Sequence, residues 1–276
     1  MTKLIFIVGS PRSGTTITGG VLGCHPKITT VSCPYYMMEK HHQYNPDDIL
    51  TRNHITPESK ADIENFYAGI LAENYTEYIV DQSPRNSFRI DYLRHIFPQA
   101  KFIHVIRNPM DVVFSIKRES DKRVSRYLGY FRTPAGHKIP EDFSYSVKYN
   151  LKRWNGGIGW GVRFRDWDKY FAIYPTLQFN AMQCTASVKA VLAYDKAVNK
   201  FMRNRYEDFL ANPITVTHSM LQFIDPKFSY KDLHDPPRVL TANMGKWKTV
   251  WGDSEIEEVL KGLKKYPPDL GYVHAR

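Results

Sequence analysis

A glycine-rich loop with one basic residue is the part of this sequence whose residue types most directly indicate a chemistry. Residues 9–16 read Gly-Ser-Pro-Arg-Ser-Gly-Thr-Thr and follow an apolar run, residues 3–8, with the pattern of a buried strand. A helix is expected from residue 15 to residue 22, so the loop would lie at a helix N-terminus, where backbone N–H groups bind anions. The glycines have the Walker A spacing, but Thr15 stands where that loop has its phosphate-binding lysine. Arg12 supplies the charge instead, which predicts a phosphate-bearing ligand other than an ordinary ATP.

A second anion site is expected where the apolar run of residues 101–106 ends. Arg107 follows this run, and Ser115 comes eight residues later on a helix that Pro109 can begin. A guanidinium and a hydroxyl on neighbouring elements can hold a second phosphate, although Arg107 could instead pair with a nearby acid such as Asp111. Two phosphate sites at neighbouring strand ends suit a bisphosphorylated adenosine better than a triphosphate chain.

The elements that must position these residues alternate between strand-like and helix-like patterns. Strands are expected at residues 3–8, 78–80 and 101–106 and near 200–206, and helices at residues 15–22, 57–75 and 86–97, from Pro109 onward and after Pro213. This order predicts an α/β fold with a parallel central sheet, flanking helices and the three-layer architecture of P-loop NTPases. Without a linker, residues 1–276 are interpreted as a single domain, in which residues 120–180 form a helical insertion or cap on the substrate side.

The composition is that of an ordinary globular protein. Of the 276 residues, 42% are hydrophobic and 24% are charged, which excludes collagen, coiled coils and wholesale disorder. The net charge is +10, and residues 121–210 carry 16 Lys or Arg against 8 Asp or Glu, which suits an anionic ligand but also a merely solvated basic face. Signatures of nucleic-acid binding are missing, and no apolar run approaches the roughly 20 residues of a membrane span. Three scattered cysteines favour reduced thiols in the cytoplasm.

The loop PRSGTT after a first strand resembles the 5′-phosphosulfate loop of sulfotransferases that use 3′-phosphoadenylyl sulfate (PAPS), including the bacterial, carbohydrate and tyrosylprotein types. Four further stretches are similar to elements of that family and follow in the same order: DQSP at residues 81–84, the segment 97–116 that holds Arg107 and Ser115, RYEDFLANP at 205–213, and MGKWK at 244–248. The resemblance covers both ends and most of the expected sheet. It is weak around residues 30–60 and 120–200, where substrate-specific parts of this family lie.

This resemblance implies transfer of a sulfuryl group from PAPS to a hydroxyl or amine, without a metal and with adenosine 3′,5′-bisphosphate as the product. The acceptor is expected to be a small molecule or a carbohydrate, and neither its identity nor the oligomeric state follows from the sequence. The residues implied in cofactor binding are Pro11, Arg12, Ser13, Gly14, Thr15 and Thr16 for the 5′-phosphosulfate, Arg107 and Ser115 for the 3′-phosphate, and Tyr206, Gly245, Lys246 and Trp247 around the nucleotide.

The sequence indicates the catalytic residues less clearly than it indicates the cofactor-binding residues. Arg12 is expected to neutralise the charge that develops on the leaving group. Related enzymes often carry a glutamate six or seven residues after the proline of a His-Pro pair, whereas here the nearest acid, Glu39, is displaced. Glu39 and Asp81 are therefore the candidate bases. Glu39 could instead lie on the solvated surface, and Asp81 could instead have a turn or capping role. Gln82 stands where the family has a lysine.

Two other functions remain open at this point. A P-loop kinase or NTPase would use Asp81 at a strand end and Thr16 to hold magnesium, although the missing loop lysine argues against it. A nucleotide-binding module without catalysis would explain Gln82 and the displaced Glu39.

Overall fold

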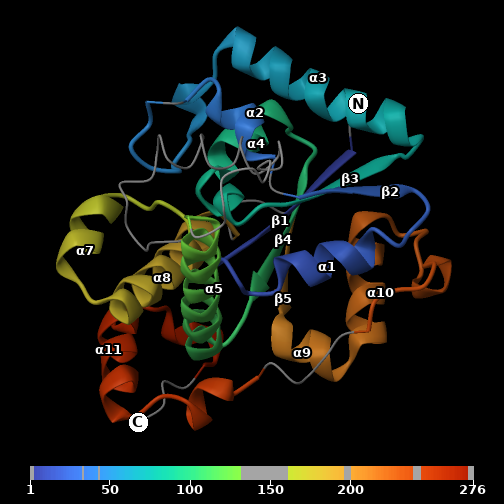
Figure 1. The fold of residues 1–276 in the computed structure, drawn as a ribbon. Helices are drawn as coiled ribbons and strands as arrows, with labels where there is room; N and C mark the ends of the chain where they lie inside the picture. The colour runs from blue at the N-terminus through green and yellow to red at the C-terminus, as the bar shows by residue number, and fades with distance from the viewer. Residues whose placement is uncertain are drawn as a thin grey trace.

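A five-stranded parallel sheet forms the centre of the protein, in the strand order β2-β3-β1-β4-β5 (Figure 1). The structure is a computed structural model that describes residues 3–32, 34–42, 44–131, 161–195, 200–238 and 244–272. The strands are β1 (Lys3–Gly9), β2 (Ile28–Val31), β3 (Tyr78–Gln82), β4 (Lys101–Ile106) and β5 (Phe201–Arg205). Because the strands are parallel, the residues that follow β1, β3, β4 and β5 share one edge of the sheet.

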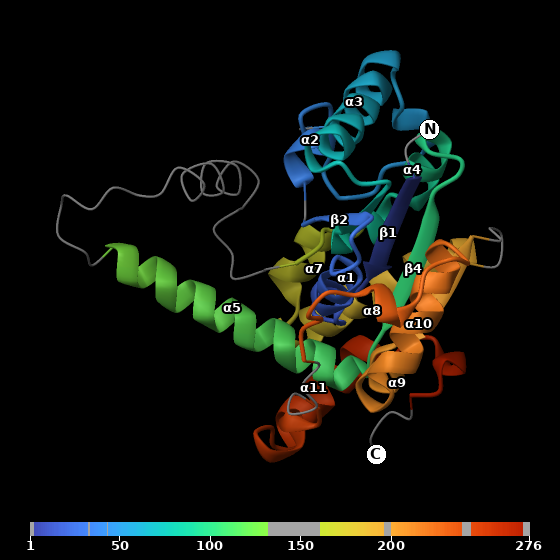
Figure 2. The ribbon, with the colours of Figure 1, turned by 90° about the vertical axis from the view of Figure 1, so that its right-hand side faces the viewer.

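Helices cover both faces of the sheet and give three layers. Helices α3 (Pro57–Asn74), α4 (Ile90–Ile96) and α8 (Thr176–Asp195) pack on one face, and α1 (Thr15–Leu22), α9 (Tyr206–Ala211) and α10 (Pro213–Ile224) pack on the other. The remaining described α-helices are α2 (Tyr35–Glu39), α5 (Pro109–Phe131), α7 (Trp167–Ile173) and α11 (Asp253–Leu263). Figure 2 shows that the distal half of α5 extends away from the sheet. The predicted α/β fold with a parallel sheet and flanking helices is confirmed.

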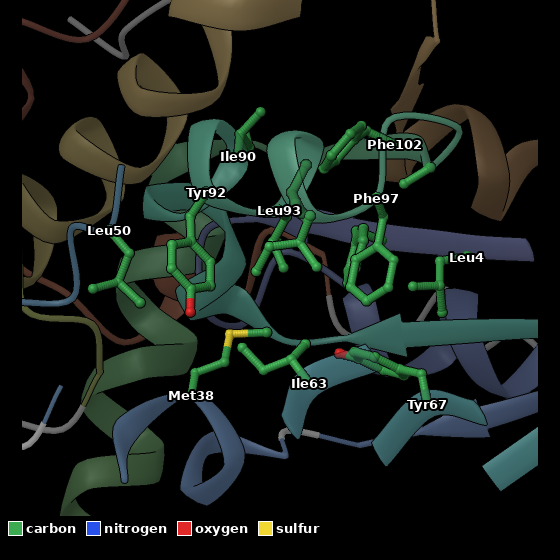
Figure 3. Packing of buried hydrophobic residues seen from close by; sticks show 14 of the residues in the cluster. Leu4, Met38, Leu50, Ile63, Tyr67, Ile90, Tyr92, Leu93, Phe97 and Phe102 are labelled. Atoms are coloured by element: carbon green, nitrogen blue, oxygen red, sulfur yellow. The ribbon is translucent and has the colours of Figure 1, made fainter. Parts of the chain in front are cut away.

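Alternating side chains of β1 separate the two apolar cores. Phe6 faces α3 and α4, while Ile7 faces α1 and α10, and both side chains are fully buried. Figure 3 shows the first of these cores, in which Tyr67 of α3 lies beside Phe97. The start of α3 is fixed by Thr56, whose Oγ1 accepts from the backbone N of Ser59 at 3.1 Å. This cap sets the position of the helix that carries Tyr67.

Most strand and helix predictions agree with the structure, and two of them differ. The strand β2 was not predicted, because Ile28–Val31 is only four residues long, too short for a clear apolar or alternating pattern. The helix expected over residues 86–97 is a 3₁₀ helix, η2 (Pro84–Phe88), followed by α4, with a break at Arg89. The predicted insertion or cap at residues 120–180 contains the end of α5, all of α7 and the start of α8, but its residues 132–160 lie outside the described part of the chain. The single-domain interpretation stays a prediction.

Among the described residues, no helix is both long and apolar enough to cross a membrane.

Candidate functional site

The loop between β1 and α1 passes between two close neighbours. A Cβ atom on Gly9 would lie 2.4 Å from the carbonyl oxygen of Val105, and one on Gly14 would lie 2.4 Å from Cδ2 of Tyr206. Both glycines also have a positive φ, 151° for Gly9 and 109° for Gly14. Only a residue without a side chain fits these positions. The two glycines therefore hold the loop against β4 on one side and against Tyr206 on the other.

Ser87 holds Gly9, the first residue of the loop, by two hydrogen bonds. The backbone N of Gly9 donates to Oγ of Ser87 at 2.9 Å, and this hydroxyl donates to the carbonyl oxygen of Gly9 at 3.0 Å. Ser87 lies in η2, directly after β3, and is buried. Ser87 was not predicted as a site residue, because the resemblance to the family element ends at Pro84 and a serine three residues later carries no signal of its own.

Arg12 is the exposed basic residue of the loop and connects the two predicted phosphate sites. Its Nε donates to Oγ of Ser115 at 3.1 Å, and its carbonyl oxygen accepts from Nη1 of Arg107 at 3.1 Å. Within the same loop, the hydroxyl of Ser13 is buried and has no hydrogen-bond partner among the described residues. The loop thus offers a charge at its surface and an unsatisfied hydroxyl inside it.

Arg107 is the first residue after β4 and is held by an aromatic ring. Only 7% of Arg107 is exposed, and its Cζ lies 4.7 Å from the ring centroid of Tyr206, the first residue of α9. Stacking fixes the plane of the guanidinium, so that Arg107 can present its N–H groups in a defined direction. Arg12, Arg107 and Ser115, which come from three different segments, therefore lie side by side at the carboxyl edge of the sheet.

The segment around Trp247 is fixed to the beginning of α5. The backbone N of Gly245 donates to Oδ1 of Asp111 at 2.7 Å, and Trp247 is buried in the apolar cluster that contains Met110. Burial raises the pKa of Asp111, and the hydrogen bond from Gly245 opposes that rise. The positive charge of Arg107 also lowers the pKa of Asp111, so this carboxylate interacts both with Gly245 and with Arg107. Lys246, between Gly245 and Trp247, is partly exposed on this segment.

Glu39 lies in a buried group of four charged residues and not in a solvated surface run. It is 2% exposed, and its Oε1 pairs with Nη1 of Arg85 and lies 3.4 Å from Nη2 of Arg89. The carboxylate of Asp48, also buried, lies 3.6 Å from both guanidinium groups. The solvated surface position considered for Glu39 is therefore wrong, because two arginines of the segment after β3 hold this side chain inside. Its role as a base stays a prediction.

Asp81 and Gln82 end β3 and point to opposite faces of the sheet. Asp81 is fully buried, and its Oδ2 accepts from the hydroxyl of Tyr67 at 2.6 Å. Burial raises the pKa of Asp81 to about 6, against the opposing effects of Tyr67 and other polar neighbours. Gln82 packs on α1, where a Cβ atom on Gly19 would lie 3.0 Å from its Cδ. Asp81 is thus part of the α3 side of the sheet, and its predicted role as a base is not tested by this placement.

Among the described residues, no three His, Cys, Asp or Glu side chains are grouped as the ligands of a metal ion would be.

A family model described as the sulfotransferase family matches residues 5–155, which are 151 of the 276 residues. The chain belongs to the sulfotransferase family. The matched range contains the loop, Arg107 and Ser115, whereas Tyr206, Gly245 and Trp247 lie beyond it.

Curated relatives of this chain are similar to it over part of their length. Nodulation protein NoeE of Sinorhizobium fredii is 29% identical over 129 residues, which are 41% of this chain and 31% of that protein. A putative protein-tyrosine sulfotransferase of Caenorhabditis briggsae is 25% identical over 155 residues, which are 54% of this chain and 51% of that protein. The chain thus spans between about a third and a half of these relatives.

Solved structures show the same fold at low sequence identity. The sulfotransferase domain of the Synechococcus PCC 7002 olefin synthase has a TM-score of 0.53 at 18% identity and is covered over 98% of its length by 97% of this chain. The sulfotransferase domain of the curacin biosynthetic pathway has a TM-score of 0.55 at 17% identity, with 99% and 97% covered, respectively.

The buried carboxyl of Asp81 makes a prediction about pH and stability. Its pKa in the folded protein, about 6, is above the ordinary value of 3.8, so between these values the folded state binds the proton more tightly than the unfolded state. The contribution of Asp81 to stability therefore falls as the pH rises through this window. Asp81→Asn can still accept from Tyr67 but has no charge to bury, so its free energy of unfolding relative to wild type should rise by on the order of 3 kcal/mol from about pH 4 to about pH 7.

Urea unfolding of both proteins across this range is the measurement, and Asp225→Asn is the matched control. Asp225 also accepts from a tyrosine hydroxyl, that of Tyr78 at 2.5 Å, but this bond lowers its pKa. The relative stability of Asp225→Asn should therefore fall as the pH rises. Parallel curves for wild type and Asp81→Asn would contradict the assignment of a raised pKa to Asp81.

Proposed function

We propose that this sulfotransferase transfers a sulfuryl group from PAPS to a hydroxyl or amine of a small-molecule or carbohydrate acceptor. The observation that carries the proposal is the contact between the loop and the end of β4, where Nη1 of Arg107 donates to the carbonyl oxygen of Arg12 and Nε of Arg12 donates to Ser115. Two anion-binding groups that touch suit a nucleotide with phosphates on both the 5′ and 3′ positions of one ribose.

The residues present fit the binding of such a nucleotide. Backbone N–H groups at the start of α1 and the unsatisfied hydroxyl of Ser13 suit the 5′ side, together with Pro11, Gly14, Thr15 and Thr16 of the loop. Arg107 and the hydroxyl of Ser115 suit the 3′-phosphate, with Tyr206, Gly245, Lys246 and Trp247 nearby as the resemblance implies. When bound, PAPS supplies the activated sulfuryl group and leaves as adenosine 3′,5′-bisphosphate.

The chain's own residues supply the charge and the proton acceptor. Arg12 is the exposed cation of the loop, and it can stabilise negative charge that develops on the leaving group, so the scheme needs no metal. Ser115 accepts from Arg12 and keeps its own proton to donate to a phosphate oxygen, which couples the two anion sites. Glu39 and Asp81 remain the candidate bases. Each is buried with a partner, so either must change that contact before it takes the acceptor's proton.

The kinase or NTPase alternative has less support. It requires an acidic side chain at the end of β3 for magnesium, but Asp81 faces Tyr67 on the α3 side. The loop also carries Thr15 where a Walker A lysine would stand.

Binding of adenosine 3′,5′-bisphosphate should depend on Arg107. The Arg107→Ala protein should lose about 2 to 3 kcal/mol of binding free energy in calorimetric titration, because a charged hydrogen-bond partner of the 3′-phosphate is removed. ATP with magnesium, titrated beside it, should bind wild type more weakly than the bisphosphate. Unchanged bisphosphate affinity in the variant would remove the 3′-phosphate assignment, and a preference for ATP with magnesium would favour the kinase alternative.

Arg12 should matter more for turnover than for binding. Arg12→Ala should lower kcat by roughly 10²- to 10³-fold, the effect of removing one preorganised donor to a developing charge. Bisphosphate affinity should fall much less, because the carbonyl group that Arg107 contacts is retained. Arg12→Lys should restore part of the rate, since it keeps the charge without the planar fork. Steady-state transfer to an acceptor found by screening gives kcat, and a near-normal value for Arg12→Ala would assign the catalytic charge elsewhere.

A further inference from the structure

Residues 268–272, called the 268–272 segment below, lie against the ends of β4 and β5. Leu270 is buried in the same apolar cluster as Ile106, the last residue of β4. Arg205, the last residue of β5, donates from Nη1 to the carbonyl oxygen of Leu270 at 2.9 Å. Its guanidinium also lies over the ring of Tyr272, with Cζ 4.5 Å from the centroid. An apolar anchor, a hydrogen bond and a stacked ring therefore fix this segment at the edge of the sheet that carries Arg107.

A hydrogen-bonded chain leads from this segment to the end of β4. The hydroxyl of Tyr272 donates to Oε2 of Glu207 at 2.5 Å, and Oε1 of the same carboxylate accepts from the backbone N of Asn108 at 2.8 Å. The pKa of Tyr272 is raised, mainly by burial and also by Glu207, so the hydroxyl keeps the proton that it donates. One carboxylate thus connects two parts of the chain that are 164 residues apart, from position 108 to position 272.

Asn108 occupies the turn that joins the two groups assigned to the 3′-phosphate. It directly follows Arg107, and its Oδ1 accepts from the backbone N of Met110 at 2.9 Å, which caps the start of α5. Ser115 lies on this helix. A shift of Asn108 would therefore move Arg107 and Ser115 together.

Three consecutive residues at the junction of β5 and α9 contact either the 268–272 segment or Arg107. Arg205 and Glu207 contact the 268–272 segment, while Tyr206 between them stacks on Arg107 and limits the space at Gly14. The 268–272 segment and the guanidinium of Arg107 are thus held by neighbouring residues at the junction of β5 and α9.

We propose that the 268–272 segment is a latch that positions Arg107 and Ser115 for the 3′-phosphate, with Tyr272 acting through Glu207 and Asn108. Tyr272 and Glu207 are positioning residues in this arrangement, because they act on the phosphate-binding groups through Asn108 and do not themselves hold the phosphate. The inference rests on the proposed function, since it assigns the 3′-phosphate of the nucleotide to Arg107 and Ser115.

The test compares two nucleotides that differ in the 3′-phosphate alone. Tyr272→Phe removes the hydroxyl and keeps the ring over Arg205, and it should weaken binding of adenosine 3′,5′-bisphosphate by about 3- to 10-fold, the effect of one lost hydrogen bond. Binding of adenosine 5′-phosphate should change by less than about twofold, because the loop is not altered. A loss of general stability would weaken both nucleotides alike, so the ratio of the two affinities reports on the 3′ site.

Tyr78→Phe is the matched control. The Tyr78 hydroxyl also donates to a carboxylate at 2.5 Å, that of Asp225, but Tyr78 begins β3 at the opposite edge of the sheet. This variant should leave the ratio of the two affinities at the wild-type value. Thermal unfolding of both variants confirms that each is folded at the titration temperature.

Substitutions of Glu207 provide a second, independent test of the latch. Glu207→Ala should weaken bisphosphate binding by more than about 10-fold, and Glu207→Gln should recover most of it, since its amide oxygen can still accept from Asn108. An unchanged affinity ratio in Tyr272→Phe, or no recovery in Glu207→Gln, would overturn the latch. Failure of wild type to bind the bisphosphate would instead overturn the proposed function, so the two failures are distinguishable.

Discussion

The whole site depends on how closely the loop after β1 approaches its neighbours. Gly9 passes so near to the Val105 carbonyl, and Gly14 so near to the Tyr206 ring, that a Cβ atom at either position would overlap them. This close passage brings the carbonyl oxygen of Arg12 within 3.1 Å of Arg107. Tyr206 then has two contacts at once, because it limits the space at Gly14 and stacks on Arg107. A side chain added at Gly14 would therefore disturb both anion-binding groups.

The second constraint is the burial of charge in a group of residues that includes Glu39 of α2. Glu39 and Asp48 are buried against Arg85 and Arg89, so each charge in this group has an opposite partner. Removing one member of such a group leaves an uncompensated buried charge, which costs far more than the net value of the pairs. The region in which the sequence has its weakest resemblance to the family is thus organised by arginines from the segment after β3, and these hold the carboxylate that the sequence offers as a base.

Residues whose type and spacing form a local pattern could be predicted from the sequence. Residues whose role depends on contacts with distant parts of the chain could not. The strands at residues 3–8 and 101–106, the glycine loop and the pair Arg107 and Ser115 follow from local patterns. The burial of Glu39 depends on residues some 50 positions away, and the role of Ser87 depends on a bond to Gly9, so neither has a local signal. Asp81 was expected one residue beyond a strand, whereas β3 continues to Gln82 and includes it, and its contact with Tyr67 depends on where α3 packs. The cytoplasmic location expected from the cysteines stays a prediction.

A crystal structure with adenosine 3′,5′-bisphosphate would show whether the Arg12 loop and the end of β4 form one nucleotide site. We expect the 3′-phosphate within hydrogen-bond distance of Arg107 and Ser115, and the 5′-phosphate on the backbone N–H groups at the start of α1. A nucleotide bound with its 3′-phosphate in solvent, or bound away from the loop altogether, would contradict this expectation.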